Sequence, residues 1–253
     1  MAYTLKASGI ATNLIACVVV DEDGTTITDL AGNAITLGTG VSATVATGSW
    51  KGSSRNYFGT LANGTFDFYG VTWNTPPAVT DDDADGIAVW CAFHGADSPN
   101  TVLACIAGSA GDVRGFGKAA ATGKGTYRSG GTVANTTTDL PTDGTTKFSF
   151  GMSYESADSS EAFYGLESGS LSSEDTETSD GGFGGAYNLH SLGGVSGQGR
   201  HESRIYCFCV FDRKLTETEM DSLHDDWFGT LIDAGGSPPA APVFRRSLLG
   251  AGF

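Results

Sequence analysis

Short apolar segments, separated by glycine-rich or acidic turns, run through most of the chain. Residues 14–20, 87–93 and 101–107 are apolar almost throughout, which predicts strands buried on both faces. In residues 147–154 apolar side chains alternate with small or polar ones, the period-two pattern of a strand with one buried face. The same pattern predicts further strands at residues 25–29, 34–37, 57–59, 64–70, 115–118, 125–128, 162–166, 187–189 and 204–211.

The spacing of these segments favours a β-sandwich or a barrel. Turn signals recur about every 8–12 residues. Glycine supplies 37 of the 253 residues, about twice its usual share of roughly 7%. No apolar run reaches the roughly 18 residues of a membrane-spanning helix, and Met1–Lys6 lacks the layout of a signal peptide. The formal net charge of -15 argues against nucleic-acid binding, because phosphates would be repelled, and is otherwise explained by solubility.

One amphipathic helix is predicted near the C-terminal end, from Thr216 to about Trp227. Thr216 and Glu219 have the spacing of a capping box, in which each side chain binds the backbone N–H of the other. Leu215 and Met220 flank this cap as a hydrophobic staple. We expect this short helix to lie as a lid on the sandwich.

The five cysteines, Cys17, Cys91, Cys105, Cys207 and Cys209, all lie inside apolar runs. A free cysteine behaves as a small buried hydrophobe, so we expect buried thiols and assembly in a reducing cytoplasm. Cys207 and Cys209 share one face of a strand. A metal site built on this pair would need further ligands, and no second pair or nearby histidine supplies them.

After residue 232 the composition changes. Residues 235–242 form a Pro/Gly-rich linker with an extended tendency. We therefore divide the chain into a domain of residues 1–232 and a C-terminal segment of residues 233–253, which is interpreted as a docking arm or as a disordered end. The arm would use two arginines and four large apolar side chains, Phe244, Arg245, Arg246, Leu248, Leu249 and Phe253.

The order of these pieces resembles the concanavalin A-like, laminin-G-type jelly roll. The segment D-G-T-T-I-T-D-L-A-G-N at residues 23–33 is similar to the opening of such domains. Residues 204–220 are similar to their last strand and the short helix after it. The resemblance covers residues 14–232 and implies an all-β, two-sheet sandwich with one short C-terminal helix and an extended tail.

Such domains with a Pro-rich tail resemble virion proteins of tailed bacteriophages. The resemblance implies a non-enzymatic structural protein of the virion, such as a capsid decoration, spike or tail component, assembled in the host cytoplasm. Its partners would be other virion proteins, in a homo-oligomer, with no nucleic acid or membrane. The alternative is a carbohydrate-binding module that recognises host-surface or environmental glycans.

Two tryptophans and a basic hairpin are the candidate glycan contacts. Trp50 and Trp73 flank predicted loops, where indoles stack on sugar rings or form the edge of a core. Residues 114–128 are locally basic and suit an acidic neighbour, a charged glycan, or a strand edge protected by charge.

A calcium turn is the candidate metal site. Asp81, Asp83 and Asp85 precede Gly86 as in the first half of a calcium loop, but the twelfth position is Ala92 instead of the usual glutamate. The sequence therefore predicts either a calcium-binding turn, with calcium as the one cofactor, or a solvated acidic turn.

No catalytic residues are predicted. Some concanavalin-like folds hydrolyse glycosides with two carboxylates on one strand face, about 5 Å apart. Here Glu174 and Glu177 would alternate to opposite faces of a strand, and their Ser/Thr/Asp-rich setting favours a solvated loop. No serine or cysteine is tied to a histidine by local spacing.

Overall fold

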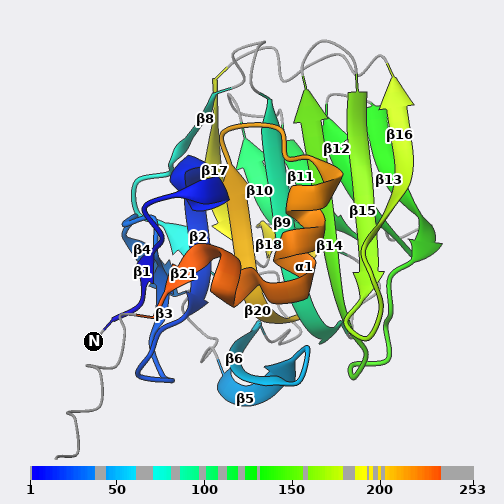
Figure 1. Cartoon of the computed structure of the whole chain (residues 1–253). Coiled ribbons are helices and arrows are strands. Elements are labelled where there is room, and N and C mark those ends of the chain that lie inside the picture. Colours follow the sequence, from blue (N-terminus) through cyan, green and yellow to red (C-terminus); the bar gives the residue numbers. More distant parts are fainter. Residues whose placement is uncertain are drawn as a thin grey trace, which may run out of the picture.

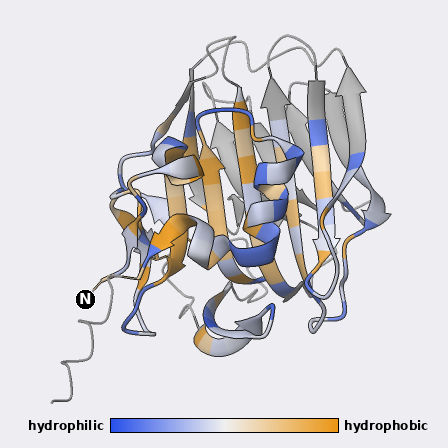
Figure 2. Ribbon diagram, in the orientation of Figure 1, coloured by the Kyte–Doolittle hydropathy of each residue, from blue (hydrophilic) through white to orange (hydrophobic). Residues whose placement is uncertain are grey.

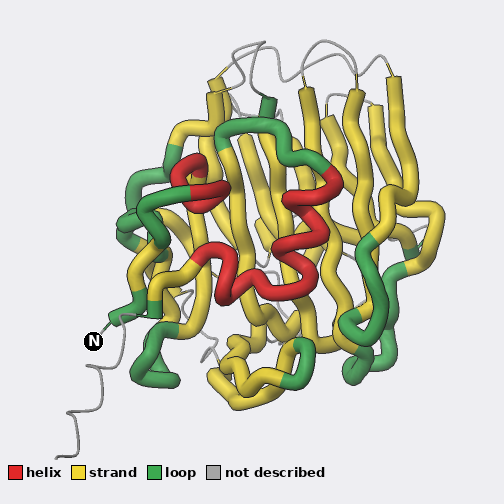
Figure 3. The backbone as a smooth tube through the Cα atoms, in the orientation of Figure 1, coloured by secondary structure: helices red, strands yellow, loops and turns green. Residues whose placement is uncertain are grey.

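The computed structural model describes residues 2–37, 44–60, 71–80, 86–96, 101–107, 113–118, 123–129, 132–155, 159–178, 186–192, 194–195, 199–200 and 203–234. These residues form two antiparallel sheets packed face to face, with one α-helix on the outside (Figures 1 and 3). The predicted two-sheet sandwich with a single C-terminal helix is confirmed.

The nine-stranded sheet has β9 and β20 at its centre. Its order is β16 (Ser172–Thr178), β15 (Ser159–Leu166), β14 (Lys147–Glu155), β9 (Ile87–Ala96), β20 (Ser203–Phe211), β2 (Leu14–Val20) and β3 (Ile27–Asp29). The hairpin β5 (Thr44–Trp50) and β6 (Ser53–Thr60) joins it through β6 and β20.

The eight-stranded sheet lies behind it in Figure 1. Its order is β13 (Thr132–Asp139), β12 (Lys124–Ser129), β11 (Val113–Lys118), β10 (Thr101–Ala107), β17 (Ala186–Leu192), β7 (Val71–Trp73) and β4 (Ile35–Leu37), with β8 (Ala78–Thr80) on β17. Short elements complete the described chain: β1 (Thr4–Leu5) with β21 (Ile232–Asp233), β18 (Gly194–Val195) with β19 (Gly199–Arg200), and the 3-10 turn η1 (Gly9–Asn13).

Side chains that alternate along the strands build two separate cores. Ala16 and Val18 of β2 point between the sheets, whereas Cys17 points outward into a second cluster. Between the sheets, Phe116 of β11 stacks on Phe150 of β14 with ring centroids 4.5 Å apart. The predicted burial of residues 14–20 from both sides therefore has a simple cause, because the second sheet covers one face and the helix the other. Figure 2 shows the apolar strands beneath the hydrophilic outer side of that helix.

Helix α1 (Glu217–Leu231) covers the outer face of the nine-stranded sheet (Figure 1). The predicted capping box between Thr216 and Glu219 is confirmed. The helix runs four residues past the predicted end, across a break at Asp226, whose φ and ψ of -154° and 72° are not helical. Asp226 Oδ1 accepts a hydrogen bond of 2.9 Å from the Gly229 N–H, so this side chain caps the last turn.

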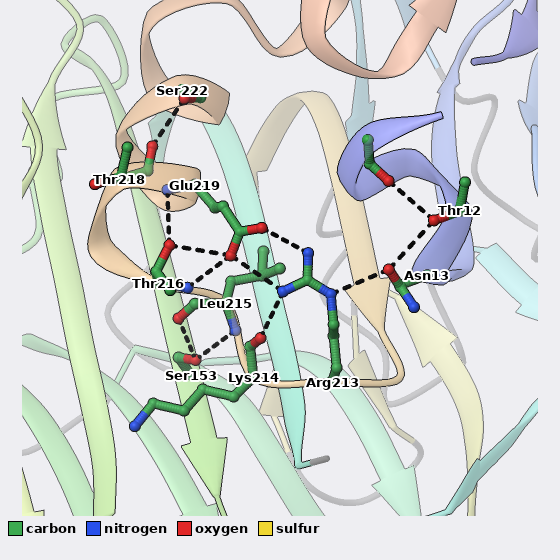
Figure 4. A network of polar contacts seen from close by, with 11 residues as sticks. Thr12, Asn13, Ser153, Arg213, Lys214, Leu215, Thr216, Thr218, Glu219 and Ser222 are labelled. Atoms are coloured by element: carbon green, nitrogen blue, oxygen red, sulfur yellow. Dashed lines mark hydrogen bonds and ion pairs between the residues drawn. The ribbon is translucent and has the colours of Figure 1, made fainter. Parts of the chain in front are cut away.

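Arg213 fixes the first turn of α1 to the sheet (Figure 4). Its guanidinium donates to both carboxylate oxygens of Glu219, at 2.6 and 3.1 Å, and its Nε donates to Asn13 Oδ1 at 3.0 Å. The hydrogen bonds from Arg213 lower the pKa of the Glu219 carboxyl to about 2. One arginine thus joins the helix cap to the chain segment just before β2.

Several finer predictions need correction. Residues 115–128 form the predicted hairpin β11–β12. Strand β13 pairs with the outer side of β12, so the hairpin is not the edge of the sheet and its charges do not protect an edge.

Glu174 lies on edge strand β16 and not in a loop. Its Oε2 accepts a 2.9 Å hydrogen bond from the Thr138 N–H of β13, which ties the two sheets together at one end. Asp233 of β21 pairs with Thr4 of β1, next to the predicted domain boundary at residue 232. The strand predicted at 64–70 lies outside the described residues.

Candidate functional site

The prediction that Trp50 and Trp73 contact sugars is wrong. Both indoles are buried, with 3% and 1% of their surface exposed. Trp50 Nε1 donates to the His224 carbonyl oxygen at 2.8 Å, and Trp73 Nε1 donates to Asp29 Oδ2 at 2.8 Å. Their ring faces and their N–H groups are used inside the protein, so the alternative interpretation as core residues is confirmed.

Two further candidate sites, the calcium turn and the docking arm, lie outside the described residues. The calcium turn with Asp81, Asp83 and Asp85 falls in the gap at residues 81–85. The docking arm falls within residues 235–253, which include Phe244, Arg245, Arg246, Leu248, Leu249 and Phe253. Both stay predictions.

A surface groove of about 190 Å³ lies in the described part of the chain. Its lining comes from four segments, namely the N-terminal residues, the end of β2, the hairpin β5–β6 and the end of α1. The lining residues are Tyr3, Val20, Ser54, Arg55, Asn56, Trp227 and Phe228. We call this site the Arg55 groove.

Aromatic rings hold the guanidinium of Arg55 in place at the groove. The Arg55 guanidinium carbon lies 4.1 Å from the centre of the Phe228 ring, a cation–π distance. Tyr3 meets Phe228 edge to face, with ring centroids 5.1 Å apart and an angle of 84°. Burial, followed by the charge of Glu22, raises the pKa of the Tyr3 hydroxyl, so it remains a neutral donor at physiological pH.

Polar contacts fix these segments around the groove. The Tyr3 N–H donates to Asp21 Oδ1 at 2.9 Å. Lys51 Nζ of the hairpin turn pairs with Asp225 Oδ1 of α1 at 3.2 Å, and Thr47 orients the Asn56 amide by donating to its Oδ1 at 2.9 Å. The groove therefore presents an aromatic ring, a planar cation and an amide in a fixed arrangement, which suits a ligand with apolar faces and oxygen-rich edges.

A buried serine–histidine pair proves to be structural. Ser149 Oγ lies 2.7 Å from His224 Nδ1, and both side chains have no exposed surface. His224 Nε2 lies 3.1 Å from the Gly169 carbonyl oxygen. A carbonyl only accepts, so Nε2 carries the proton and Nδ1 accepts from Ser149. The pair leaves no space for a substrate, and burial lowers the pKa of His224, so the ring stays neutral.

The predicted burial of the thiols is confirmed for Cys17, Cys91, Cys207 and Cys209. The side chain of Cys105 lies outside the described part of the structure. Local spacing did not reveal that a third thiol lies beside Cys207 and Cys209. Cys17 comes from β2, and its Sγ lies 3.7 Å from that of Cys209, so pairing of the strands supplies what local spacing does not show.

The two sheets and the covering helix define an antiparallel β-sandwich with one C-terminal helix. No protein-family model matches the chain, and no curated protein matches it. Several solved structures do match the chain. The binding domain of Paraclostridial Mosquitocidal Protein 1 is 13% identical with a TM-score of 0.52, over 87% of this chain and 53% of that one.

Two botulinum neurotoxin structures are similar to the same extent. The binding domain of botulinum neurotoxin DC, in complex with rat synaptotagmin II, is 10% identical with a TM-score of 0.52, over 86% of this chain and 52% of that one. Botulinum neurotoxin type C, described as dependent on two ganglioside molecules for entering cells, gives the same four values: 10%, 0.52, 86% and 52%.

These similarities establish the fold. The chain spans about half the length of the solved chains, 52–53%. The sandwich part of the family resemblance is thereby confirmed, whereas the laminin-G assignment and the virion setting stay predictions. Among the described residues, no helix combines the length and the apolar character needed to cross a membrane.

Proposed function

We propose that the chain is a non-enzymatic carbohydrate-binding module, and that the Arg55 groove binds a sugar of a surface glycan. The observation that carries the proposal is the arrangement of Arg55 against Phe228, at 4.1 Å, beside the half-buried ring of Tyr3. Sugar rings have apolar C–H faces, which pack on aromatic rings, and hydroxyl edges, which need fixed hydrogen-bond partners.

An acidic sugar suits this groove best. The planar guanidinium presents N–H donors in a fork that matches a carboxylate, and the Phe228 ring limits its rotation. The net charge of -15 and the carboxylates of Asp21 and Glu22 beside Tyr3 oppose an acidic ligand. At physiological salt the repulsion from the distant charges is screened beyond roughly 8 Å. The attraction of Arg55 acts at contact distance and is screened less.

The solved structures support this proposal over a purely structural role. Two of them are named binding domains, and the third is described as depending on two ganglioside molecules for cell entry. The virion role depends on residues 233–253, almost all of which lie outside the described residues. It is tested by deleting residues 236–253 and measuring incorporation into particles, where unchanged incorporation would exclude the docking arm.

The test is a glycan array that covers neutral and acidic bacterial and animal surface glycans, followed by titration of each glycan bound. We expect Arg55→Ala and Tyr3→Ala each to weaken binding at least about tenfold, which corresponds to roughly 1.4 kcal/mol. Arg204→Ala is the matched control, because it removes another half-buried arginine, which lies outside the groove and donates to the Gly144 carbonyl oxygen.

Four outcomes are informative. Binding that both groove variants weaken and the control leaves intact would support the function and the site. Binding that neither groove variant changes would keep the function and exclude the Arg55 groove. Silence of the folded chain on all glycans would refute the proposal, and release of reducing sugar would refute its non-enzymatic part.

A further inference from the structure

Three cysteine thiols meet in the core between the nine-stranded sheet and α1. The Sγ atoms of Cys17, Cys207 and Cys209 all lie within 4.8 Å of one another. Cys207 and Cys209 are 3.4 Å apart, and Cys209 and Cys17 are 3.7 Å apart. We call these three residues the thiol cluster.

The pairing of β2 with β20 builds this cluster. Cys17 lies directly opposite Cys209 in the antiparallel ladder, and Cys207 lies opposite Val19. Side chains two residues apart on a strand point to the same face, so Cys207 and Cys209 both face Cys17. Cys91 provides a useful contrast. It pairs with Phe208, and both residues belong to the other core, between the two sheets.

The cluster is closed to solvent. Each of the three side chains has no exposed surface, and all three belong to the apolar core beneath α1. Among the described residues, no further cysteine, histidine, aspartate or glutamate joins the group. The site therefore offers three sulfur ligands and no fourth protein ligand of these types.

We propose that the thiol cluster binds a soft, thiophilic metal ion in three-coordinate, all-sulfur geometry, and that Cu(I) is the ion it suits best. Metal–sulfur bonds of about 2.3 Å in a trigonal site place the sulfurs about 4 Å apart. The sulfur separations of 3.4 and 3.7 Å, with all three within 4.8 Å, require only small side-chain rotations to reach this geometry.

Coordination chemistry distinguishes Cu(I) from zinc here. Thiolates select both ions, but zinc in proteins takes four ligands, and a dry site with three sulfurs does not provide the fourth. Each thiol that becomes a thiolate ligand releases its proton to solvent, so retention of the metal should increase with pH. No change in oxidation state is required when copper is supplied as Cu(I).

Burial also determines how the ion is loaded. Because α1 covers the cluster, we expect the ion to bind while the chain folds. The experiment therefore unfolds the full-length chain in guanidinium with a reductant and refolds it without oxygen in the presence of equimolar Cu(I). After removal of loosely bound copper with a competing chelator, the metal per chain is measured by mass spectrometry.

The expected result is about one copper per chain, with X-ray absorption showing sulfur ligands only, at about 2.3 Å. Cys17→Ala should reduce the retained copper at least tenfold. Cys91→Ala is the matched control, since it removes one equally buried thiol from the other face of the same sheet, and it should retain the wild-type amount.

Other results would overturn the proposal. These are negligible copper in the refolded wild type, equal losses in the two alanine variants, or zinc retained as well as copper in a parallel refolding. If Cys17→Ala does not fold, as judged by circular dichroism without metal, the X-ray absorption spectrum of the copper-loaded wild-type protein tests the proposal by itself. Fewer than three sulfur neighbours would then refute the three-coordinate site.

Discussion

Replacing Glu219 by glutamine tests how strongly the first turn of α1 holds the helix to the sheet. The carboxylate accepts two hydrogen bonds from Arg213 and one of 2.9 Å from the Thr216 N–H. Glutamine is also found at this position of a capping box, so the variant keeps the cap and removes mainly the charge. Loss of the ion pair should therefore dominate the change in stability.

The magnitude follows from the titration of Glu219. Hydrogen bonds from Arg213 lower the pKa of its carboxyl from 4.5 to about 2, which sets a ceiling of roughly 3 kcal/mol at 1.36 kcal/mol per pKa unit. The two side chains are 27% and 26% exposed, so solvent screening reduces the expected loss to about 2 kcal/mol near neutral pH. A lowered folded-state pKa stabilises the protein above pH 4.5, and this contribution is lost as the pH falls toward about 2.

Urea unfolding, followed by circular dichroism, measures this effect at about pH 7 and about pH 3. We expect the cost of Glu219→Gln to fall from about 2 kcal/mol to below about 1 kcal/mol between these two conditions. Glu217→Gln removes the same charge from an exposed position in the same first turn, and should cost less than about 0.5 kcal/mol at either pH. An equal cost of Glu219→Gln at both pH values would refute the ion-pair argument.

Two further predictions concern the cores. Gly125→Ala should destabilise the protein by about 1–3 kcal/mol in urea unfolding, because its Cβ would lie 2.6 Å from the Phe150 ring; Gly169→Ala, whose nearest contact is 3.6 Å, is the control. Wild-type stability should also decrease as the pH falls below 6.5, because the buried, neutral His224 resists a proton that the unfolded chain takes up. In His224→Gln this loss should be smaller, and an unchanged pH dependence would contradict the assignment.

Local patterns predicted the central strands and the helix, but they missed β5, β7, β8, β13 and β16. The alternation in residues 147–154 places Phe148 and Phe150 in the core between the sheets, since a period of two fixes which side chains share a face. The cap at Thr216 depends on residues three apart and was also readable. The helix end was not, because Asp226 caps a further turn after a break that hydrophobic periodicity does not reveal.

The candidate site could not be predicted because it joins distant segments. Tyr3, Arg55 and Phe228 meet only after the N-terminal segment, the β5–β6 hairpin and α1 have packed together. The prediction that Trp50 contacts a sugar failed for the same kind of reason. Its position at the edge of a predicted loop does not show that the indole N–H donates to a helix carbonyl 174 residues away. Residue type suggests a chemistry, but only tertiary contacts decide whether solvent reaches it.

Helix α1 links the two proposals while leaving them independent. Its last turns supply Phe228 to the Arg55 groove, and its buried face closes the core that holds the thiol cluster. The groove lies at the surface, and every binding event requires the helix to be in place. The thiol cluster requires the helix only to keep solvent away from the metal after loading. Weakening the helix by Glu219→Gln should thus lower glycan affinity only as far as it unfolds the helix end, but should speed the loss of copper to a chelator. Equal copper loss from the variant and the wild type would mean that α1 does not control access to the thiol cluster.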